Sequence, residues 1–236
     1  MPHTPTQWID ITAGADSYPG YLALPPTGRG PGILIVQEIF GVNEHIRSVA
    51  QQYALDGYVA LAPDLFWRTQ PRVELGYTDV DRAQGFALMQ KTDLQQATED
   101  LAAAAQTLRA RPEVIGKVAS IGYCFGGQMS YRLAARGAVD AAVAYYGGGI
   151  ENALELAERV RAPILFHYGA RDSSIPLDAI ERVKQRFAGR NNAQFHIYHD
   201  AAHGFNCWAR ASYNQRAAAL ARGRTLIFLS ENLSTY

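Results

Sequence analysis

The chain has 236 residues, 48% of them hydrophobic, and its 22 Lys and Arg residues balance 22 Asp and Glu residues. This composition excludes a disordered chain and a coiled coil. The zero formal net charge gives no whole-molecule field that would draw the protein to nucleic acid or to an anionic membrane. We therefore expect neither kind of partner.

The two cysteines are not needed for a structural disulfide, because a chain of this length buries a sufficient core of its own. Residues 1–8 have neither the basic nor the apolar region of a secretory signal. No stretch approaches the roughly 18 apolar residues of a membrane span. We expect a cytoplasmic protein whose thiols are reduced.

Strands and helices alternate along most of the sequence. Two strands open the chain, one around Ile9 and one over residues 18–24, and a turn-rich connection follows over residues 25–32. Short, mostly apolar runs then predict six strands of a parallel sheet: residues 33–36, 58–62, 118–121, 141–144, 164–166 and 194–198. Helical patterns lie between and after them: residues 44–55, 94–108, 128–136, 177–187 and 209–229. The alternation predicts an α/β fold, with about seven or eight strands in a mostly parallel sheet and helices on both faces.

No Gly/Ser-rich linker, low-complexity tract or internal repeat divides the chain, which predicts a single domain over residues 1–236. The longest irregular stretch is residues 63–77. It follows a predicted strand end, where open α/β sheets place their ligands. We expect this stretch either to shape a pocket or to form a plain surface connection.

A nucleophile elbow is predicted at Cys124. The buried strand runs directly into Gly122-Tyr123-Cys124-Phe125-Gly126 and then into a helix. Glycines flank the nucleophile of such an elbow because the turn brings strand and helix too close for side chains. The helix N-terminus also favours the reactive thiolate. A buried structural cysteine beside a glycine-rich helix start is the alternative.

Two later loops supply partners for this thiol. In hydrolases of this architecture the nucleophile is followed along the chain by an acid and then by a histidine. Asp172 follows the strand at 164–166, and His203 follows the strand at 194–198. Asp172 would orient the imidazole and His203 would act as the general base. The alternatives are a helix N-cap for Asp172 and a surface histidine for His203.

A metal site competes for the histidines of this region. The candidates lie in a short span: His196, His199, His203 and Cys207. Side chains alternate along a strand, so His196 and His199 point to opposite faces, which counts against one ion binding both. We expect neither a metal nor a cofactor. The remaining histidines stand in no motif: His3, His45 and His167.

Glu38 follows the strand at 33–36 and therefore lies on the same rim as Cys124. A carboxylate beside a thiol could hold or remove its proton, although most glutamates at strand ends are only solvated. The backbone N–H groups of Ile39 and Phe125 would suit an oxyanion hole. Arg82 could bind a substrate carboxylate, but from its position alone a solvated surface arginine is the better interpretation.

Taken together, these segments resemble the dienelactone hydrolase family, whose enzymes are also called carboxymethylenebutenolidases. The matching motifs run in order over nearly the whole chain: Gln-Glu-Ile-Phe-Gly at 37–41, Ala-Pro-Asp-Leu at 62–65, Gly-Tyr-Cys-Phe-Gly-Gly at 122–127, Tyr-Tyr-Gly at 145–147 and His-Gly-Phe at 203–205. The resemblance implies an α/β-hydrolase fold. It also implies hydrolysis of a cyclic enol-lactone that bears a carboxylate, as in the degradation of chlorinated aromatics.

The resemblance assigns roles residue by residue. It implies that Cys124 is the nucleophile, His203 the base and Asp172 the acid that orients it. Glu38 matches a carboxylate that contacts the resting thiol. The resemblance implies that this thiol stays neutral until substrate displaces the glutamate, which then helps to form the thiolate.

Arg82 matches an arginine that pairs with the substrate carboxylate, and Ile39 and Phe125 match the oxyanion-hole amides. Three positions depart from the family: Gly204 replaces a hydroxyl residue, Cys207 a second carboxylate-binding arginine, and Met89 a pocket aromatic. One guanidinium fewer predicts weaker or different carboxylate recognition, and a bulkier or less acidic ester is an alternative substrate.

The sequence therefore predicts a cofactor-free Cys-His-Asp hydrolase that opens a lactone or small ester through a thioester intermediate. Its partner would be a small molecule, and the oligomeric state is left open. A thioesterase or a general carboxylesterase would use the same residues. A non-catalytic binding module on the same fold is a further alternative, because fold does not determine function.

Overall fold

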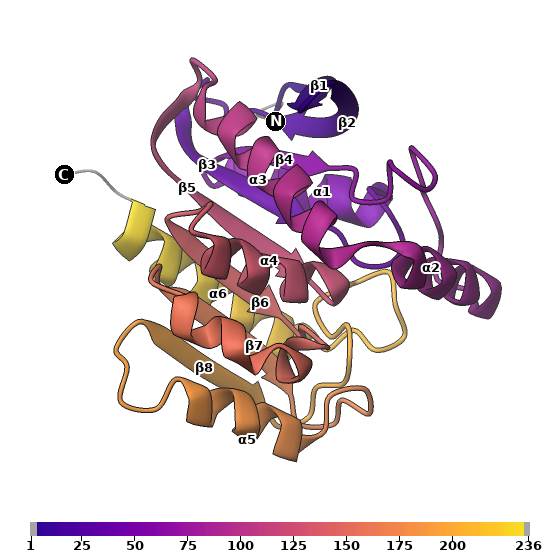
Figure 1. Ribbon diagram of the computed structural model, residues 1–236, viewed down its shortest axis with the longest axis vertical. Helices are drawn as coiled ribbons and strands as arrows, with labels where there is room; N and C mark the ends of the chain where they lie inside the picture. Colours follow the sequence, from indigo (N-terminus) through magenta and orange to yellow (C-terminus); the bar gives the residue numbers. More distant parts are fainter. Residues whose placement is uncertain (1–3, 234–236) are drawn as a thin grey trace.

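The core of the protein is an eight-stranded sheet with the order β1-β2-β4-β3-β5-β6-β7-β8 (Figure 1). The computed structural model describes residues 4–233. β1 and β2 pair antiparallel, as do β2 and β4, whereas every other neighbouring pair from β4 to β8 is parallel. The prediction of a mostly parallel α/β sheet with seven or eight strands is confirmed.

The strands match the predicted apolar runs. They are β1 Thr6–Ala13, β2 Asp16–Ala23, β3 Gly30–Val36, β4 Val59–Pro63, β5 Val114–Tyr123, β6 Ala141–Tyr145, β7 Ile164–Gly169 and β8 Ala193–Tyr198. β4, β6 and β7 are buried at every residue because helices cover both faces, whereas the edge strand β8 is largely accessible. Val36 of β3 pairs with Gly122 of β5. Glu38 and Cys124 each lie two residues beyond this pair, so they follow the ends of neighbouring strands on the same edge of the sheet.

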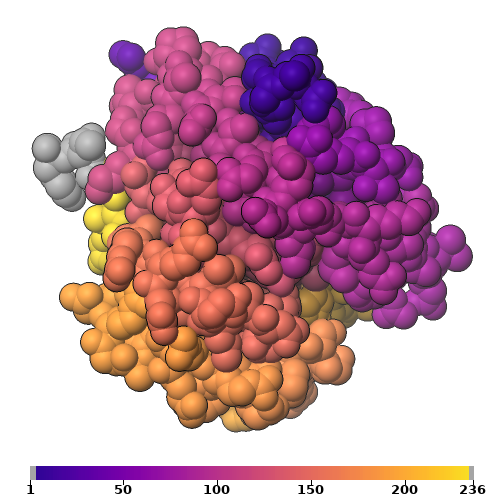
Figure 2. Space-filling view, viewed as in Figure 1, coloured from indigo at the N-terminus to yellow at the C-terminus, as the bar shows by residue number. Residues whose placement is uncertain are grey.

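Helices form a layer on each side of the sheet. They are α1 Glu44–Leu55, α2 Asp79–Lys91, α3 Leu94–Arg109, α4 Phe125–Arg136, α5 Leu177–Arg186 and α6 Gln215–Leu233, with 3₁₀ turns η1 Ile150–Asn152 and η2 Leu154–Arg159. α3, α4 and α5 lie in front of the sheet in Figure 1, α6 lies behind it, and in Figure 2 the front helices close over the strands. On the rear face Arg222 of α6 donates to Gln52 of α1 at 3.1 Å. No helix between residues 4 and 233 is long and apolar enough to cross a bilayer.

α2 and α6 differ most from the prediction, and α4 begins at Phe125 instead of residue 128. α2 was not predicted, because only Gly85 and Leu88 of it are buried and its sequence has no clear apolar face. Its start is marked by a capping box, in which Thr78 accepts from the N–H of Asp81 and the Asp81 side chain accepts from the N–H of Thr78. α6 begins at Gln215 instead of residue 209, because the Asn214 side chain caps the N–H of Ala217.

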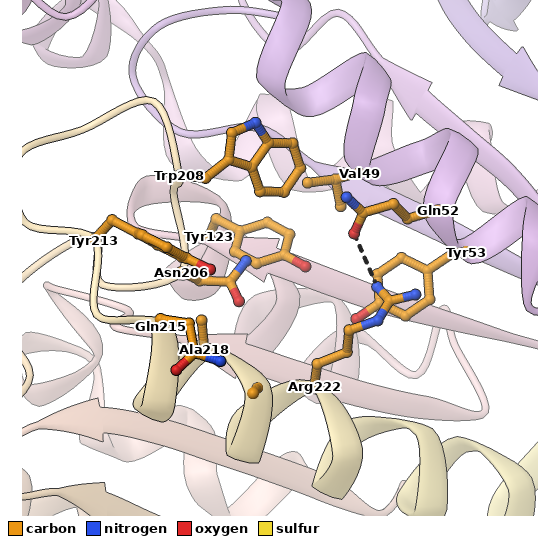
Figure 3. A pocket seen from close by; sticks show the side chains of 11 residues that line it. Val49, Gln52, Tyr53, Tyr123, Asn206, Trp208, Tyr213, Gln215, Ala218 and Arg222 are labelled. Atoms are coloured by element: carbon orange, nitrogen blue, oxygen red, sulfur yellow. Dashed lines mark hydrogen bonds between the residues drawn. The ribbon is translucent and has the colours of Figure 1, made fainter.

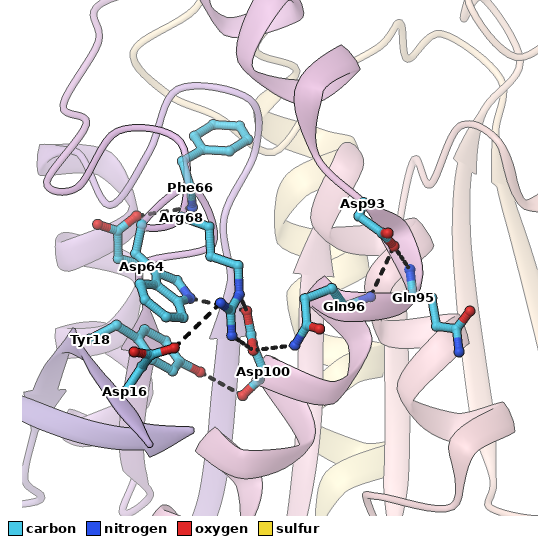
Figure 4. Close-up of polar contacts among 10 residues, drawn as sticks. Asp16, Tyr18, Asp64, Phe66, Arg68, Asp93, Gln95, Gln96 and Asp100 are labelled. Carbon is cyan, nitrogen blue, oxygen red and sulfur yellow. Dashed lines mark hydrogen bonds and ion pairs between the residues drawn. The ribbon is translucent and has the colours of Figure 1, made fainter. Parts of the chain in front are cut away.

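The irregular stretch at 63–77 is held by two buried carboxylates. Asp64 accepts from the N–H groups of Phe66 at 3.0 Å and Arg72 at 2.6 Å. Asp100 of α3 accepts from Trp67 Nε1 and from Arg68 Nε and Nη2 (Figure 4). The end of the stretch then runs beside residue 41, where Gly41 and Glu74 form an isolated β-bridge. This stretch is therefore a fixed wall near the end of β3.

Candidate active site

Cys124 lies between β5 and α4 in a strained backbone conformation, with φ +56° and ψ −115°. The flanking glycines are required by close packing. A Cβ at Gly122 would lie 1.8 Å from the Gly126 carbonyl oxygen, and one at Gly126 would lie 2.2 Å from that of Val36. The thiol is half-buried, not enclosed in the core. The geometry is that of a nucleophile elbow, which presents the thiol above the sheet.

Cys124, His203 and Asp172 form a continuous hydrogen-bonded series. His203 Nε2 lies 3.1 Å from Cys124 Sγ, and His203 Nδ1 lies 2.7 Å from Asp172 Oδ2. The other oxygen, Asp172 Oδ1, accepts from the N–H groups of Ser174 at 2.8 Å and Ile175 at 3.2 Å, which fixes the carboxylate. Asp172 therefore holds its own turn and the imidazole together.

The charges of this series favour an ion pair. Burial lowers the pKa of His203, but the Cys124 charge and the hydrogen bonds to Asp172 and Cys124 outweigh it and raise the pKa to about 10. The raised pKa favours the imidazolium form of the ring, whose Nε2 lies 3.1 Å from Cys124 Sγ. Tyr146 packs edge-on against the imidazole, with ring centroids 5.2 Å apart, and limits its movement.

Glu38 is buried at the end of β3, with 1% of its surface exposed. Its Oε1 accepts from Arg210 Nη1 at 3.2 Å, and its Oε2 has no hydrogen-bond partner among residues 4–233. Burial raises the pKa of Glu38, against the opposing charges of Arg210 and His203. The hydrogen bonds thus join Glu38 to Arg210 and Cys124 to His203, which differs from the contact with the resting thiol that the resemblance implies. The guanidinium supplies the opposite charge that a buried carboxylate needs.

Arg210 is the site residue that sequence reasoning missed. It stands in the irregular segment between His203 and α6. The second arginine of the family pattern falls at Cys207, and Arg210 is three positions further along the chain. Gly204 makes room for it, since a Cβ at that position would lie 2.3 Å from Arg210 Nη1. The sequence prediction considered only position 207, whereas the structure places Arg210 on the wall of the pocket that Arg82 lines. No sequence signal marks it.

Arg82 and Arg210 line one pocket of about 290 Å³, together with Phe40, Tyr77 and Ser212. Arg82 lies on α2, forms an ion pair with Asp79 at 3.1 Å, and has a side chain that is 58% exposed. One pocket thus has two guanidinium groups on its wall, and one of them, Arg210, also binds Glu38. Two guanidinium groups in one pocket suit a carboxylate ligand.

α2, which contributes Arg82 to this pocket, packs closely against Ile39. A Cβ at Gly85 would lie 2.5 Å from the Ile39 carbonyl oxygen, so only glycine lets the helix approach here. Met89 lies one turn further along α2, half-buried against the core.

Two backbone N–H groups follow the ends of neighbouring strands, that of Ile39 after β3 and that of Phe125 after β5. Phe125 is the first residue of α4, so its N–H has no partner within the helix. Among the described residues, the N–H of Phe125 and that of Ile39 donate to no backbone carbonyl. Free N–H groups at such positions can bind a developing oxyanion. The two amides thus stay candidates for that role.

The candidate histidines do not gather around a metal. In the part of the chain that the structure describes, no three His, Cys, Asp or Glu side chains are grouped so that they could hold an ion. His203 is hydrogen-bonded on both ring nitrogens within the thiol series. Cys207 is fully buried, and burial followed by the Glu38 charge raises the pKa of its thiol to about 12.

Residues 18–233 match the model of the dienelactone hydrolase family. The chain belongs to this family. It is 36% identical over 226 residues to a carboxymethylenebutenolidase of Pseudomonas sp. strain P51, across 95% of this chain and 94% of that one. It is 38% identical over 207 residues to a carboxymethylenebutenolidase of Pseudomonas putida, across 87% and 88% of the two chains. The predictions of the family and of a hydrolase acting on carboxylic ester bonds are confirmed.

Solved structures agree with this assignment. The crystal structure of a putative dienelactone hydrolase from Klebsiella pneumoniae superimposes with a TM-score of 0.86 at 31% identity, over 97% of this chain and 99% of that one. A dienelactone hydrolase-like promiscuous phosphotriesterase from metagenomic libraries superimposes with a TM-score of 0.81 at 26% identity, over 98% and 99% of the two chains. The α/β-hydrolase fold predicted from the sequence is confirmed.

Proposed function

We propose that the protein hydrolyses a carboxylate-bearing lactone or small ester, with Cys124 as the nucleophile. The observation that carries the proposal is the hydrogen-bonded series of Cys124, His203 and Asp172 at the elbow. A thiolate held beside an imidazolium is a nucleophile that is ready at neutral pH. The pocket that Arg82 and Arg210 line has two guanidinium groups that suit a carboxylate, and Arg210 connects it to Glu38.

In the first half of the reaction the Cys124 thiolate attacks the carbonyl carbon of the substrate. The carbonyl electrons move to its oxygen, and the N–H groups of Ile39 and Phe125 stabilise that oxyanion. Collapse of the tetrahedral intermediate breaks the C–O bond and leaves a thioester. His203 Nε2 gives its proton to the departing alkoxide or enolate. In a lactone the leaving oxygen stays tethered to the acyl chain.

The second half restores the enzyme. His203, now neutral, takes a proton from water as the water attacks the thioester carbonyl. The second tetrahedral intermediate expels the Cys124 thiolate and releases the carboxylic acid. The imidazolium and the thiolate are thereby regenerated. Asp172 keeps the Nδ1 proton in place throughout, so Nε2 always faces the reacting atoms.

Substrate recognition rests on the two arginines. Arg82 is bound to Asp79 on an exposed turn, so a substrate carboxylate can displace that contact at little cost. Arg210 binds Glu38 and also lines the pocket, so its guanidinium can serve a second carboxylate. We expect esters that carry a carboxylate to have a lower KM than neutral esters of the same size.

Hydrolysis of cis- and trans-dienelactone and of p-nitrophenyl acetate tests the proposal. Wild type, Cys124→Ala and Cys207→Ala are compared, and the last is a matched control because it removes the other thiol. We expect Cys124→Ala to lose kcat by at least about a thousandfold and Cys207→Ala to retain it. Equal turnover by wild type and Cys124→Ala would refute the nucleophile.

A panel of thioesters and neutral carboxylic esters separates the two related alternatives. A thioesterase would prefer an acyl thioester over the oxygen ester of the same acid. A general carboxylesterase would turn over neutral and carboxylate-bearing esters alike. If no substrate reacts and iodoacetamide does not label Cys124 at any pH, the fold serves a binding module instead.

A further inference from the structure

Helix α4 opens to the surface at two arginines. Every residue of α4 from Phe125 to Ala135 is buried except Arg132, and Arg136 follows one turn later. Residues four apart lie on the same face of a helix, so both side chains leave α4 on one side. α4 packs against α3 and against the 3₁₀ turn η2. The two arginines therefore stand where charge meets solvent on a helix that is otherwise enclosed.

A pocket of about 310 Å³ lies between these three elements. α3 contributes Glu99 to its wall, α4 contributes Arg132 and Arg136, and η2 contributes Leu156 and Arg159. The other lining side chains are uncharged. The pocket shares no lining residue with the one beside Glu38. It is therefore a separate site on the helix layer.

The positive charge of this pocket exceeds the negative charge. Arg136 donates to both oxygens of Glu99, from Nε at 2.8 Å and from Nη2 at 3.1 Å. These hydrogen bonds lower the pKa of Glu99, so the carboxylate is ionised at neutral pH. Arg132 and Arg159 form no ion pair and no side-chain hydrogen bond with any residue from 4 to 233. Two guanidinium groups thus remain without a counter-charge.

Neighbouring carboxylates of η2 do not supply it. Glu155 and Glu158 are absent from the wall of the pocket, and Glu158 pairs with Arg186 of α5 at 2.9 Å. The formal net charge of the whole chain is zero, so the excess is local to this pocket.

Both unpaired guanidinium groups can be reached by a ligand. Arg159 is exposed. Arg132 Nε is buried without a partner, whereas Nη1 and Nη2 of the same side chain are not enclosed in this way and keep accessible surface. The stem of Arg132 is thus fixed in the protein while its outer N–H groups face the pocket that it lines.

The pocket between α1 and α6 shows the opposite case (Figure 3). Its guanidinium, Arg222, donates to Gln52 at 3.1 Å and also pairs with Asp56. No positive charge is left over there for an anion.

We propose that the pocket of Arg132 and Arg159 binds a phosphate dianion, either free or as the phosphate group of a small ester. A phosphate monoester carries about 1.5–2 negative charges at pH 7 and three acceptor oxygens. It can therefore neutralise both unpaired guanidinium groups, each through two parallel hydrogen bonds, whereas one carboxylate can neutralise only one. Leu156 offers an apolar surface to the organic part of an ester. The inference is independent of the ester hydrolysis proposed at Cys124.

Isothermal titration calorimetry with inorganic phosphate, glycerol 2-phosphate and acetate tests the proposal, with sodium chloride keeping the ionic strength equal. We expect Arg132→Gln and Arg159→Gln each to weaken binding of both phosphates about tenfold or more, because each variant loses a charge-assisted contact. Acetate should bind at least about tenfold more weakly than phosphate to the wild type. Arg182→Gln is the matched control, because this arginine pairs with Asp178 on exposed α5, and it should leave the constants unaltered.

Arg82→Ala is titrated as well, because the pocket of Arg82 and Arg210 is also basic. Binding that is lost in Arg82→Ala and kept in Arg132→Gln overturns the inference. Absence of phosphate binding to the wild type, or acetate binding of equal strength, also overturns it. Tighter binding of glycerol 2-phosphate than of phosphate identifies an ester as the ligand, and equal binding identifies the free ion. Both results support the site. If Arg132→Gln does not fold, Arg159→Gln decides, since it alters an exposed side chain.

Discussion

The Arg210 guanidinium lies in the space that a side chain at Gly204 would occupy, since a Cβ built there falls 2.3 Å from Nη1. Gly204 has φ +76°, a conformation that glycine adopts without strain. The position of the Arg210 side chain therefore depends on the absence of a side chain at residue 204. The absence of a side chain directly after His203 allows Arg210, further along the loop, to reach Glu38.

Gly204→Ser should displace Arg210 from Glu38. The added side chain meets the guanidinium, whose charge-assisted hydrogen bond is then lost. We expect kcat to fall on charged and neutral esters alike, as in Arg210→Ala, because Glu38 loses its partner. The KM for carboxylate-bearing esters should also rise roughly tenfold or more, because the displaced guanidinium can no longer offer the substrate a contact of about 1.5–3 kcal/mol. Steady-state kinetics on matched charged and neutral esters measure this.

Gly189→Ser is the control for backbone strain. Gly189 has φ +75°, and a Cβ there would have no neighbour within 4 Å. Both variants should lose about 1–2 kcal/mol of stability from the left-handed backbone, but only Gly204→Ser should change KM. A kinetic effect of the same size in both variants would contradict the steric explanation.

Arg82→Ala and Arg210→Ala should have different kinetic effects. Arg82 binds only an exposed aspartate, so its removal should raise the KM of carboxylate-bearing esters and spare neutral ones. Arg210 also neutralises buried Glu38, so its removal should lower kcat on both classes of ester. Kinetic constants for both variants on p-nitrophenyl acetate and on a hemisuccinate ester separate these effects. Identical profiles for the two variants would contradict separate roles.

The parts of the site that follow strand ends could be predicted, and the rest could not. Cys124, Asp172 and His203 each come after a run of apolar residues, and parallel strands bring their carboxyl ends to one edge of the sheet. Arg210 stands in an irregular segment without periodicity, so its position depends on the backbone conformation of Gly204 and on the buried charge of Glu38. The position of Arg210 is thus set by tertiary contacts, which leave no pattern in the local sequence.

Alkylation of Cys124 should depend on His203 at neutral and mildly acidic pH. The pKa of His203 is raised to about 10 in the folded protein, above its ordinary value of about 6.5. The contribution of the protonated His203 ring to the free energy of unfolding is thus fully present below about pH 6.5. It is lost as the pH rises through about 10, where the ring gives up its proton. We expect iodoacetamide to label the wild type rapidly at pH 6.

His203→Ala should be labelled slowly at pH 6, with a rate that rises only towards the ordinary range of a free thiol, roughly pH 8.5. Measuring labelling by mass spectrometry between pH 5 and pH 10 gives both profiles, and Cys207 reports on the second, buried thiol. Superimposable profiles for wild type and His203→Ala would exclude the ion pair.

Buried His45 should make the fold sensitive to acid. Its pKa is lowered to about 4, below the value of about 6.5 in the unfolded chain, so the unfolded state binds the proton more readily. Stability from the neutral ring is present above pH 6.5 and is lost as the pH falls towards 4. Between pH 7 and pH 4.5 this group should remove roughly 2–3 kcal/mol from the free energy of unfolding. His45→Phe cannot take up the proton, so its urea denaturation should show a correspondingly smaller loss over the same range. A pH dependence equal to that of the wild type would contradict the lowered pKa of His45.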